Sequence, residues 1–233
     1  MTKILIVTAV EAEREALLHG LSPAQQGRVD VVAGGVGAVA AGIATASILT
    51  ASIAAGHYRL AVSAGIGGVF PGVARTGELL LAGRIIAADL GAQTLEGFAS
   101  INELGFGQPV TCAARPLAGI SGITGDMLTV NTATGTAERA RELLARHPAA
   151  VGEAMEGYGV ALAGQRFGVP VAEIRAVSNP IGPRDRSAWQ IPQALVNHFR
   201  VRFINNAFTK RFRLHIEGID ARGRVIDLDK VIQ

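Results

Sequence analysis

The sequence predicts an α/β fold of three layers, in which helices cover both faces of a central, mixed and twisted sheet. The chain has 233 residues, enough to bury the core of one large domain. Hydrophobic residues make up 49% of it, aromatic residues only 5%, and the 29 glycines suit close contacts between helices and strands. Segments typical of strands also alternate with segments typical of helices along most of the chain.

The N-terminal part predicts strands and helices in turn. Residues 3–7 form a β-rich run, and residues 11–21 carry apolar side chains at helical spacing. Residues 29–33 predict a second strand, and residues 38–55 predict a helix of small side chains that can pack tightly on a sheet. Residues 60–63 predict a third strand, which is followed by a loop with the sequence AGIGG.

The rest of the chain continues this alternation, because short β-rich runs are again separated by longer segments with helical spacing. Strands are predicted at residues 78–82, 84–88, 119–124 and 171–177, and helices at residues 137–145, 155–167 and 193–203. The Glu and Arg residues of the first of these helices predict an exposed face. Glycines interrupt the second.

The domain is expected to span residues 1–206, and the last 27 residues differ from it. They hold 10 charged residues, against 31 in the 206 residues before them. Phe212, Leu214 and Ile216 alternate with basic residues, which predicts a half-exposed strand. Residues 207–233 are therefore interpreted as an atypical charged tail without a catalytic role: an added hairpin, an interface arm or a non-native extension.

An uncharged stretch, residues 31–56, is long enough to span a bilayer. Gly, Ala, Ser and Thr dominate it, so a buried strand, turn and helix are expected instead of a membrane helix. The N-terminus predicts no signal peptide.

The single Cys112 excludes an internal disulfide, and a reducing cytoplasm is the expected location. The net charge of +3 comes from scattered residues, which does not favour binding to nucleic acid.

The sequence lacks the common cofactor motifs. Gly35, Gly37 and Ala40 match the glycine pattern of dinucleotide-binding turns, but no acidic residue occurs between Asp30 and Glu78. Close packing of a helix on the sheet explains these glycines better than NAD binding does. The five histidines lack the spacing of a metal site, and no P-loop or nucleophile elbow occurs. The sequence therefore predicts no metal and no organic cofactor.

Polar residues next to the predicted strands are the candidates for a functional site. In open α/β sheets, ligands bind beyond the carboxyl ends of the strands. Glu13 follows the first strand, Glu156 lies at the start of a predicted helix, and Asn179 follows the last predicted strand. Each glutamate alone is better explained as a solvated helix residue. Their joint placement at one end of the sheet favours a shared function.

The chain contains, in this order and across roughly residues 3–200, the stretches KILIVTAVEAERE, VVAGGVGAVAAG, AGIGGVFPGVARTGELLLAG, GITGDMLTV, AMEGYGVALAGQRFGVPVAEIRAVSN and PIGPRDRSAW. This pattern resembles the nucleoside phosphorylase and nucleosidase superfamily, and within it the futalosine hydrolase family. The resemblance implies hydrolysis of the N-glycosidic bond of futalosine, with release of hypoxanthine, in menaquinone biosynthesis. It also implies a homo-oligomer, either a dimer or an assembly of dimers.

The resemblance also implies roles for single residues. Glu13 aligns with a glutamate that activates water, Glu156 with the residue that accepts from the ribose hydroxyls, and Asn179 with the residue that contacts N7 of the purine. These three are the predicted catalytic residues. The predicted substrate-binding residues are Met155 under the ribose, Leu128 and Thr129 at the edge of the base, Gly65 beside both, and Arg184 and Arg186 at the benzoate carboxylate. For the two arginines, an ordinary surface loop is an equal alternative.

Two departures from the superfamily bear on the reaction. Adenine-releasing nucleosidases carry Asp where this chain has Asn179, and an amide donor suits a 6-oxo purine better than a 6-amino purine. The mismatch with adenine would cost about 1–3 kcal/mol, which favours hypoxanthine as the leaving base. The segment LAVSAGIGG carries no Arg or Lys to bind phosphate, so water is the expected nucleophile.

Three alternatives to futalosine hydrolysis stay open at the level of sequence. They are a nucleosidase of the methylthioadenosine/S-adenosylhomocysteine type, a purine nucleoside phosphorylase, and a non-catalytic protein that binds a nucleoside. Release of adenine, dependence on phosphate, or binding without cleavage would favour each of them in turn.

Overall fold

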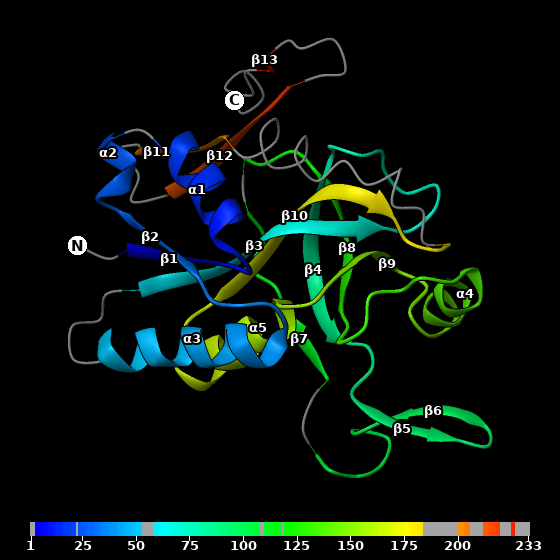
Figure 1. Ribbon diagram of the computed structural model, residues 1–233. Coiled ribbons are helices and arrows are strands. Elements are labelled where there is room, and N and C mark those ends of the chain that lie inside the picture. The colour runs from blue at the N-terminus through cyan, green and yellow to red at the C-terminus, as the bar shows by residue number, and fades with distance from the viewer. Residues whose placement is uncertain are drawn as a thin grey trace.

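The computed structural model describes residues 3–21, 23–52, 58–107, 110–117 and 119–183, and the backbone of three strands within residues 200–226. It confirms the predicted fold class, because helices lie on both faces of a mixed sheet (Figure 1). Residues 31–52 of the uncharged stretch form the end of a strand, a turn and a helix, as predicted. Within the residues described, no helix is long and apolar enough to cross a membrane.

One part of the sheet is parallel, with strands in the order β3-β1-β2: β1 (Lys3–Thr8), β2 (Val29–Ala33) and β3 (Tyr58–Val69). Two helices lie on one face and one on the other (Figure 1): α1 (Glu11–Gly20) and α2 (Pro23–Gln26), and opposite them α3 (Ala38–Ser52). The predicted elements of this part are confirmed, apart from the loop AGIGG. That segment continues β3 instead.

β1 supplies side chains to both faces of the sheet, because alternate residues of a strand point in opposite directions. Ile4 and Ile6 pack with Leu17 of α1. Leu5 and Val7 belong to the apolar cluster that α3 and α5 (Gly157–Arg166) complete on the opposite face. All of these side chains are buried.

The other part of the sheet closes into a ring through β3. Its strands are β4 (Leu79–Ala87), β7 (Thr111–Ala113), β8 (Ile123–Thr129), β9 (Ala150–Ala154) and β10 (Val171–Pro180). β10 pairs with both β3 and β4, β4 pairs with β8, β8 with β9, and β9 with the end of β3. β7 pairs with β4 outside this ring.

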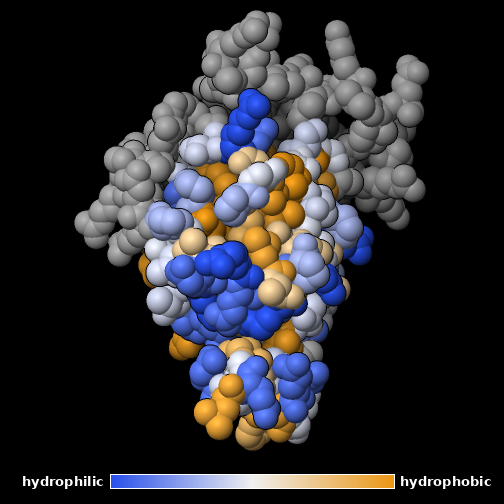
Figure 2. Space-filling model, turned by 90° about the vertical axis from the view of Figure 1, so that its right-hand side faces the viewer, coloured by the Kyte–Doolittle hydropathy of each residue, from blue (hydrophilic) through white to orange (hydrophobic). Residues whose placement is uncertain are grey.

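Helix α4 (Ala137–Arg146) covers the ring at one side of the molecule. Its buried residues Ala140 and Leu143 pack in a cluster with Phe70 and Leu128. Its outer side carries ion pairs between Arg and Glu residues, and Figure 2 shows it as a hydrophilic patch. The hairpin of β5 (Gly91–Thr94) and β6 (Gly97–Ser100) projects below it.

Several predictions in the second half differ from the structure. The strands predicted at 78–82 and 84–88 are the single strand β4, and the strand predicted at 119–124 starts only at Ile123. The sequence pattern does not predict β5, β6, β7 or β9, which are all five residues or shorter. Short strands contain too few residues to establish an alternation.

The predicted helix at 193–203 is wrong at its end, because β11 (Arg200–Asn205) is a strand. Val201 and Phe203 alternate with arginines, which fits a strand as well as a helix. Residues 193–199 lie outside the described residues. β12 (Phe212–Ile219) confirms the strand predicted in the tail, and it pairs with β11 and with β13 (Val225–Ile226).

β3 changes its neighbour along its length. On one side β10 pairs with it throughout Ala61–Val69. On the other side β1 pairs with it as far as Ser63, and β9 pairs with it only at Gly68 and Val69. Among the described strands, residues 64–67 therefore have no ladder partner on that side. Their backbone groups can bind side chains instead.

Candidate active site

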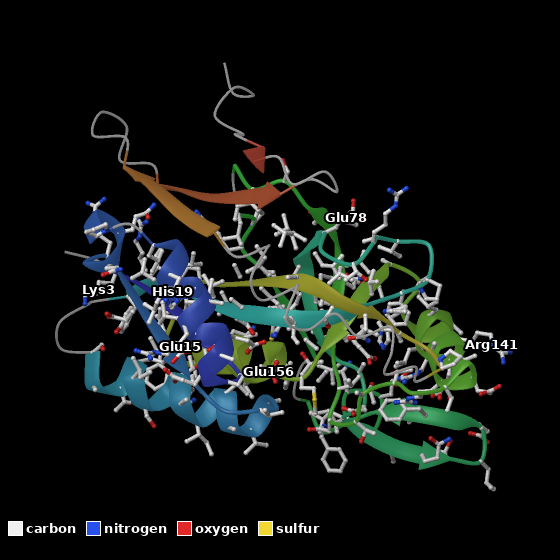
Figure 3. All side chains as sticks on the ribbon, turned by 45° about the horizontal axis from the view of Figure 1, so that its top comes forward. Lys3, Glu15, His19, Glu78, Arg141 and Glu156 are labelled. Atoms are coloured by element: carbon white, nitrogen blue, oxygen red, sulfur yellow. The ribbon has the colours of Figure 1, made fainter. Side chains whose placement is uncertain are left out.

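The gap at residues 64–67 of β3 is where two predicted catalytic residues meet. Glu13 reaches it from α1 and Glu156 from the start of α5. The Ile66 N–H donates to Glu13 Oε1 at 2.9 Å, and the Ile66 carbonyl accepts from Arg175 Nη1 at 3.5 Å. In Figure 3, Glu156 lies in the interior of the molecule between α1 and α3, whereas Arg141 lies at its periphery.

Three backbone N–H groups hold the Glu13 carboxylate. Oε2 accepts from Ala9 at 2.8 Å and from Val10 at 3.2 Å, and Oε1 accepts from Ile66. Val10 is the N-cap of α1, so its bond to Glu13 is half of a capping box. Glu13 is only 5% exposed. An ionised carboxylate offers about four acceptor positions, which leaves Glu13 one for a water molecule.

Glu156 is held from two sides. Its Oε2 accepts from Arg175 Nη1 at 3.1 Å, and its Oε1 accepts from the Gly37 N–H at 3.2 Å. Gly37 lies in the turn between β2 and α3 and has a φ of +93°, a conformation that favours glycine. The glycine-rich turn therefore does more than allow close packing, because its backbone binds a carboxylate of the site.

Arg175 lies at the centre of the site and is 1% exposed. Its Nε donates to Glu173 Oε1 at 2.9 Å, and its Nη2 donates to Ser63 Oγ at 2.7 Å. Burial alone would lower the pKa of Arg175, but the surrounding carboxylates more than offset this effect and raise it. The guanidinium therefore stays charged and balances part of the negative charge of the site.

Gly65, a predicted substrate-binding residue, lies between Glu13 and Arg175. A Cβ atom at this position would lie 2.5 Å from Glu13 Oε1 and 2.9 Å from Arg175 Nη1. Only glycine leaves both side chains where they are. The same Nη1 atom binds Glu156, so the space beside Gly65 separates Glu13 from the guanidinium that holds Glu156.

Asn179, the third predicted catalytic residue, does not contact the two glutamates. It pairs with Gly68, three residues beyond Gly65 on β3, which corresponds to about 10 Å along a strand. The side chain is half-buried. Its Nδ2 donates to the Pro180 carbonyl at 3.0 Å, and its Oδ1 lies 2.8 Å from Ser178 Oγ.

The remaining predicted binding residues occupy different surroundings. Met155 is half-buried in the link between β9 and α5. Leu128 is buried in the apolar cluster beneath α4. Thr129 is buried, and its Oγ1 accepts from the Tyr158 N–H at 2.9 Å, which ties β8 to the start of α5. Arg184 and Arg186 lie outside the described residues.

The structure also has a hollow that none of the residues around Arg175 lines. It is a groove of about 660 Å³ between α3 and α5, here called the α3–α5 groove, and its apolar lining includes Val39, Ile43, Leu162 and Phe167. Val39 and Ile43 are 73% and 64% exposed. In the part of the chain that the structure describes, no three His, Cys, Asp or Glu side chains are grouped to hold a metal ion.

Known relatives resemble the chain over most of its length. A futalosine hydrolase from Streptomyces coelicolor is 47% identical over 212 residues, which cover 82% of this chain and 90% of that protein. The chain belongs to the futalosine hydrolase family. A second member, from Acidothermus cellulolyticus, is 42% identical over 219 residues, covering 83% of this chain and 86% of that protein. No family model matches the chain.

Solved structures share the fold of this futalosine hydrolase family member at lower identity. A methylthioadenosine/S-adenosylhomocysteine nucleosidase from Colwellia psychrerythraea, in complex with adenine, has a TM-score of 0.69 and 21% identity, covering 84% of this chain and 90% of that one. A mutant futalosine hydrolase from Helicobacter pylori has a TM-score of 0.69 and 18% identity, covering 84% and 94%. Both belong to the predicted nucleoside phosphorylase type of fold.

Sequence reasoning missed Arg175 and Glu173, the buried pair at the centre of the site. A signal for them exists. They occupy alternate positions of the otherwise apolar strand VAEIRAV, so they face the same side of the sheet. Charged residues at alternate positions of a fully buried strand need each other or a further partner.

Proposed function

We propose that the chain hydrolyses the N-glycosidic bond of futalosine and releases hypoxanthine, as a step of menaquinone biosynthesis in the cytoplasm. One observation carries the proposal. Glu13, oriented by three N–H groups, and Glu156, oriented by Arg175, both lie at the gap in β3, because Glu13 Oε1 and the Arg175 Nη1 atom that binds Glu156 are within 3 Å of the same point beside Gly65. Membership of the futalosine hydrolase family supplies the substrate.

Glu13 is the general base of the proposed reaction. Its free acceptor position binds the attacking water and takes up the proton as the water oxygen bonds to the anomeric carbon of the ribose. The bond from that carbon to the purine nitrogen breaks, and its electron pair leaves with hypoxanthine. General base catalysis of this kind contributes about 10²–10⁴ in rate.

Glu156 binds the ribose hydroxyls in this proposal. Cleavage passes through a sugar with oxocarbenium character, so a nearby carboxylate stabilises the developing positive charge. Arg175 orients Glu156 without cancelling its charge, because the guanidinium is shared with Glu173. Met155, next to Glu156 in the chain, is proposed as the apolar wall under the sugar.

Asn179 contacts the base in this proposal. It lies about 10 Å along β3 from Gly65, which suits the purine of a nucleoside whose ribose binds Glu156. Its amide donates to N7 and, unlike a carboxylate, suits the 6-oxo group of hypoxanthine. The backbone of Leu128 and Thr129 is proposed to bind the other edge of the base.

Water is favoured over phosphate as the nucleophile. Arg175, the guanidinium at the gap, already binds two carboxylates and Ser63, and it is buried. Glu13 adds a further negative charge at the place where phosphate would bind, and like charges repel. This arrangement supports hydrolysis rather than phosphorolysis.

An end-point assay by liquid chromatography tests the proposed function. The protein is incubated with futalosine, inosine and methylthioadenosine, each with and without phosphate. We expect hypoxanthine from futalosine, with no dependence on phosphate. Adenine released from methylthioadenosine would favour the alternative nucleosidase, and a phosphate requirement would favour a phosphorylase. No release from any of the three would overturn the proposal.

We propose Arg184 and Arg186 as partners of the carboxylate on the benzoate group of futalosine. Replacement of each by Ala is expected to raise KM for futalosine and to leave KM for inosine, which lacks that group, unchanged. An unchanged KM for futalosine in both variants would remove this role.

We also propose that the chain forms a homo-oligomer through the α3–α5 groove. α3 is apolar around its whole circumference, which is typical of a helix that is covered on all sides. Its residues Val39 and Ile43 are nevertheless exposed in a single chain. Light scattering coupled to size-exclusion chromatography measures the mass, and a monomer would contradict this proposal.

A further inference from the structure

We propose that Glu173 is a positioning residue for the ribose-binding carboxylate, because it holds both Arg175 and the backbone next to Glu156. This inference rests on the proposed role of Glu156. Glu173 itself does not reach the gap in β3, since its carboxylate is bound to Arg175 Nε, on the side of the guanidinium away from Nη1.

The first step of the argument is the way Arg175 is fixed. Its guanidinium is planar, with its donors in a fixed fork. Glu173 binds Nε at 2.9 Å, Ser63 binds Nη2 at 2.7 Å, and Glu156 accepts from Nη1 at 3.1 Å. Two anchors on the far edge hold the plane, and the third nitrogen is thereby aimed at Glu156. Without Glu173, Ser63 alone holds the far edge, and the plane can turn about this bond.

The second step is the contact of Glu173 with the start of α5. Gly157 follows Glu156 directly, and a Cβ atom on it would lie 2.5 Å from Glu173 Cδ and closer still to Oε2. The carboxylate therefore packs against the bare backbone of Gly157. Glu173 thus defines the position of Glu156 from two directions, through the guanidinium and through the main chain.

The third step of the argument concerns the effect of the buried Glu173 carboxylate on the stability of the fold. The Glu173 side chain is fully buried, and its Oε2 atom has no hydrogen-bond partner among the described residues. Burial raises the pKa of Glu173, although the guanidinium partly opposes this effect. A buried ion pair that is replaced as a whole by hydrophobic side chains of similar size often costs no stability, whereas removal of one partner alone is strongly destabilising. Stability alone therefore does not explain why the pair of Glu173 and Arg175 is present, whereas the alignment of Arg175 toward Glu156 does.

The variants Glu173→Ala, Glu173→Gln and Gly157→Ala test the role by steady-state kinetics with futalosine. Glu173→Ala is expected to raise KM and to lower kcat/KM by about 10²-fold, as expected for a misplaced substrate-binding group. Glu173→Gln retains an acceptor for Arg175 Nε and is expected to recover most of this loss, although a neutral bond is roughly half as strong.

Gly157→Ala is expected to disturb the position of Glu173 without removing its carboxylate. Its methyl group displaces the Glu173 carboxylate, so a loss similar to that of Glu173→Ala is expected. Alanine has the higher helix propensity, so the loss cannot come from a weaker helix. In the double variant Glu173→Ala with Gly157→Ala, the methyl group has room, and we expect the two losses not to add.

Glu153→Gln is the matched control. Glu153 is also buried, but it binds Thr134 at 2.8 and 2.6 Å and has no bond to Arg175. Its replacement is expected to change the melting temperature and to leave KM unchanged. If Glu173→Ala and Gly157→Ala also leave KM and kcat unchanged, or if their effects add, the positioning role is overturned. Should Glu173→Ala fail to fold, Glu173→Gln and Gly157→Ala still decide it.

The wild-type protein separates this inference from the proposed function. If it releases no hypoxanthine from futalosine, the proposed function fails, and crystal structures of the wild type and Gly157→Ala then test the positioning alone. A guanidinium that still binds Glu156 in the variant, with Glu173 displaced, would overturn the role. A guanidinium turned away from Glu156 would support it.

Discussion

Two regions of the molecule depart from the usual distribution of polar and apolar residues, in opposite directions. Around Arg175 the fold buries charged side chains, and along the α3–α5 groove it exposes apolar ones. Elsewhere the described core consists mainly of apolar clusters under α1, α3 and α4, with Asp126 and Glu153 as further buried carboxylates. Buried charge and exposed apolar surface each cost free energy, so both regions are best explained by what binds there. We propose that the first region binds a small polar molecule and that the second binds a protein surface.

The largest expected effect follows from removal of the proposed general base, Glu13, from the buried charged region. Glu13→Gln is expected to lower kcat by about 10²–10⁴-fold, because an amide cannot accept the proton from water. The measurement is the rate of hypoxanthine release. Glu11→Gln is the control, since Glu11 lies in the same helical turn but is exposed and pairs with Arg14. A Glu13→Gln variant with wild-type kcat would show that the buried carboxylate has only a structural role.

A second variant changes the spacing of the charged groups and not their charge. Gly65→Ala places a methyl group between Glu13 and Arg175, and a displacement of about 1 Å is expected to lower kcat/KM by about 10²-fold. Gly27→Ala is the control, because a Cβ atom there has no neighbour within 4 Å. Equal activity of the two variants would mean that the close approach at Gly65 is not needed for catalysis.

A third variant tests the apolar region. Ile43→Asp introduces a charge into the α3–α5 groove and is expected to weaken self-association at least about tenfold, because burial of an unpaired carboxylate costs more than 1.4 kcal/mol. The mass by light scattering is followed over a range of protein concentrations. Arg141→Asp is the control, because Arg141 is exposed on α4 and lies at the periphery of the molecule (Figure 3). A mass that responds equally to both changes would contradict the assignment of the groove.

The smallest expected effect concerns Glu153, another buried carboxylate. Burial raises the pKa of Glu153 above its ordinary value of 4.5. The native state therefore binds this proton more tightly than the unfolded state, and stability falls as the pH rises from about 4.5 through the raised pKa. Glu153→Gln has no such proton and does not lose this stability. Over this pH range, the melting temperature of the variant is therefore expected to rise relative to that of the wild type, by about 2–4 °C for each kcal/mol of stability that the wild type loses.

Melting curves of both proteins between pH 4 and 8 check this expectation. Glu142→Gln, an exposed change on α4, serves as the control and is expected to follow the wild type. Parallel curves for Glu153→Gln and the wild type would show that Glu153 has the same proton affinity in both states.

The parts of the fold that local pattern determines could be predicted. β1, β2, α1, α3 and α4 end within a few residues of their expected limits, because each is an apolar run or an apolar period that begins or ends at a turn or cap. The segment AGIGG could not, because glycines weaken a strand by propensity alone. Its pairing with β10, more than a hundred residues away in the chain, makes it a strand. Such pairing leaves no local signal.

The features of the candidate site also fall into those that a local sequence pattern predicts and those that it does not. Glu13 and Glu156 could be found because each stands where a strand gives way to a helix. The shared face of Arg175 and Glu173 could be predicted from the strand VAEIRAV, but their partners could not, because contacts across the sheet leave no local signal in the sequence. The bond from Gly37 to Glu156 joins residues 119 positions apart, so the sequence could show the glycine turn but not its partner.

The place of β3 in two ladders has a consequence for folding kinetics. Its pairing with β10 joins the N-terminal third of the chain to the strand that follows the last described helix, α5, a contact of high sequence separation. Contacts of this kind form late, because the loop between them must close first. The gap that holds Glu13 and Glu156 exists only after β1, β9 and β10 have all docked on β3. Recovery of activity during refolding is therefore expected to lag behind recovery of helical circular dichroism, with no partly folded state that is active.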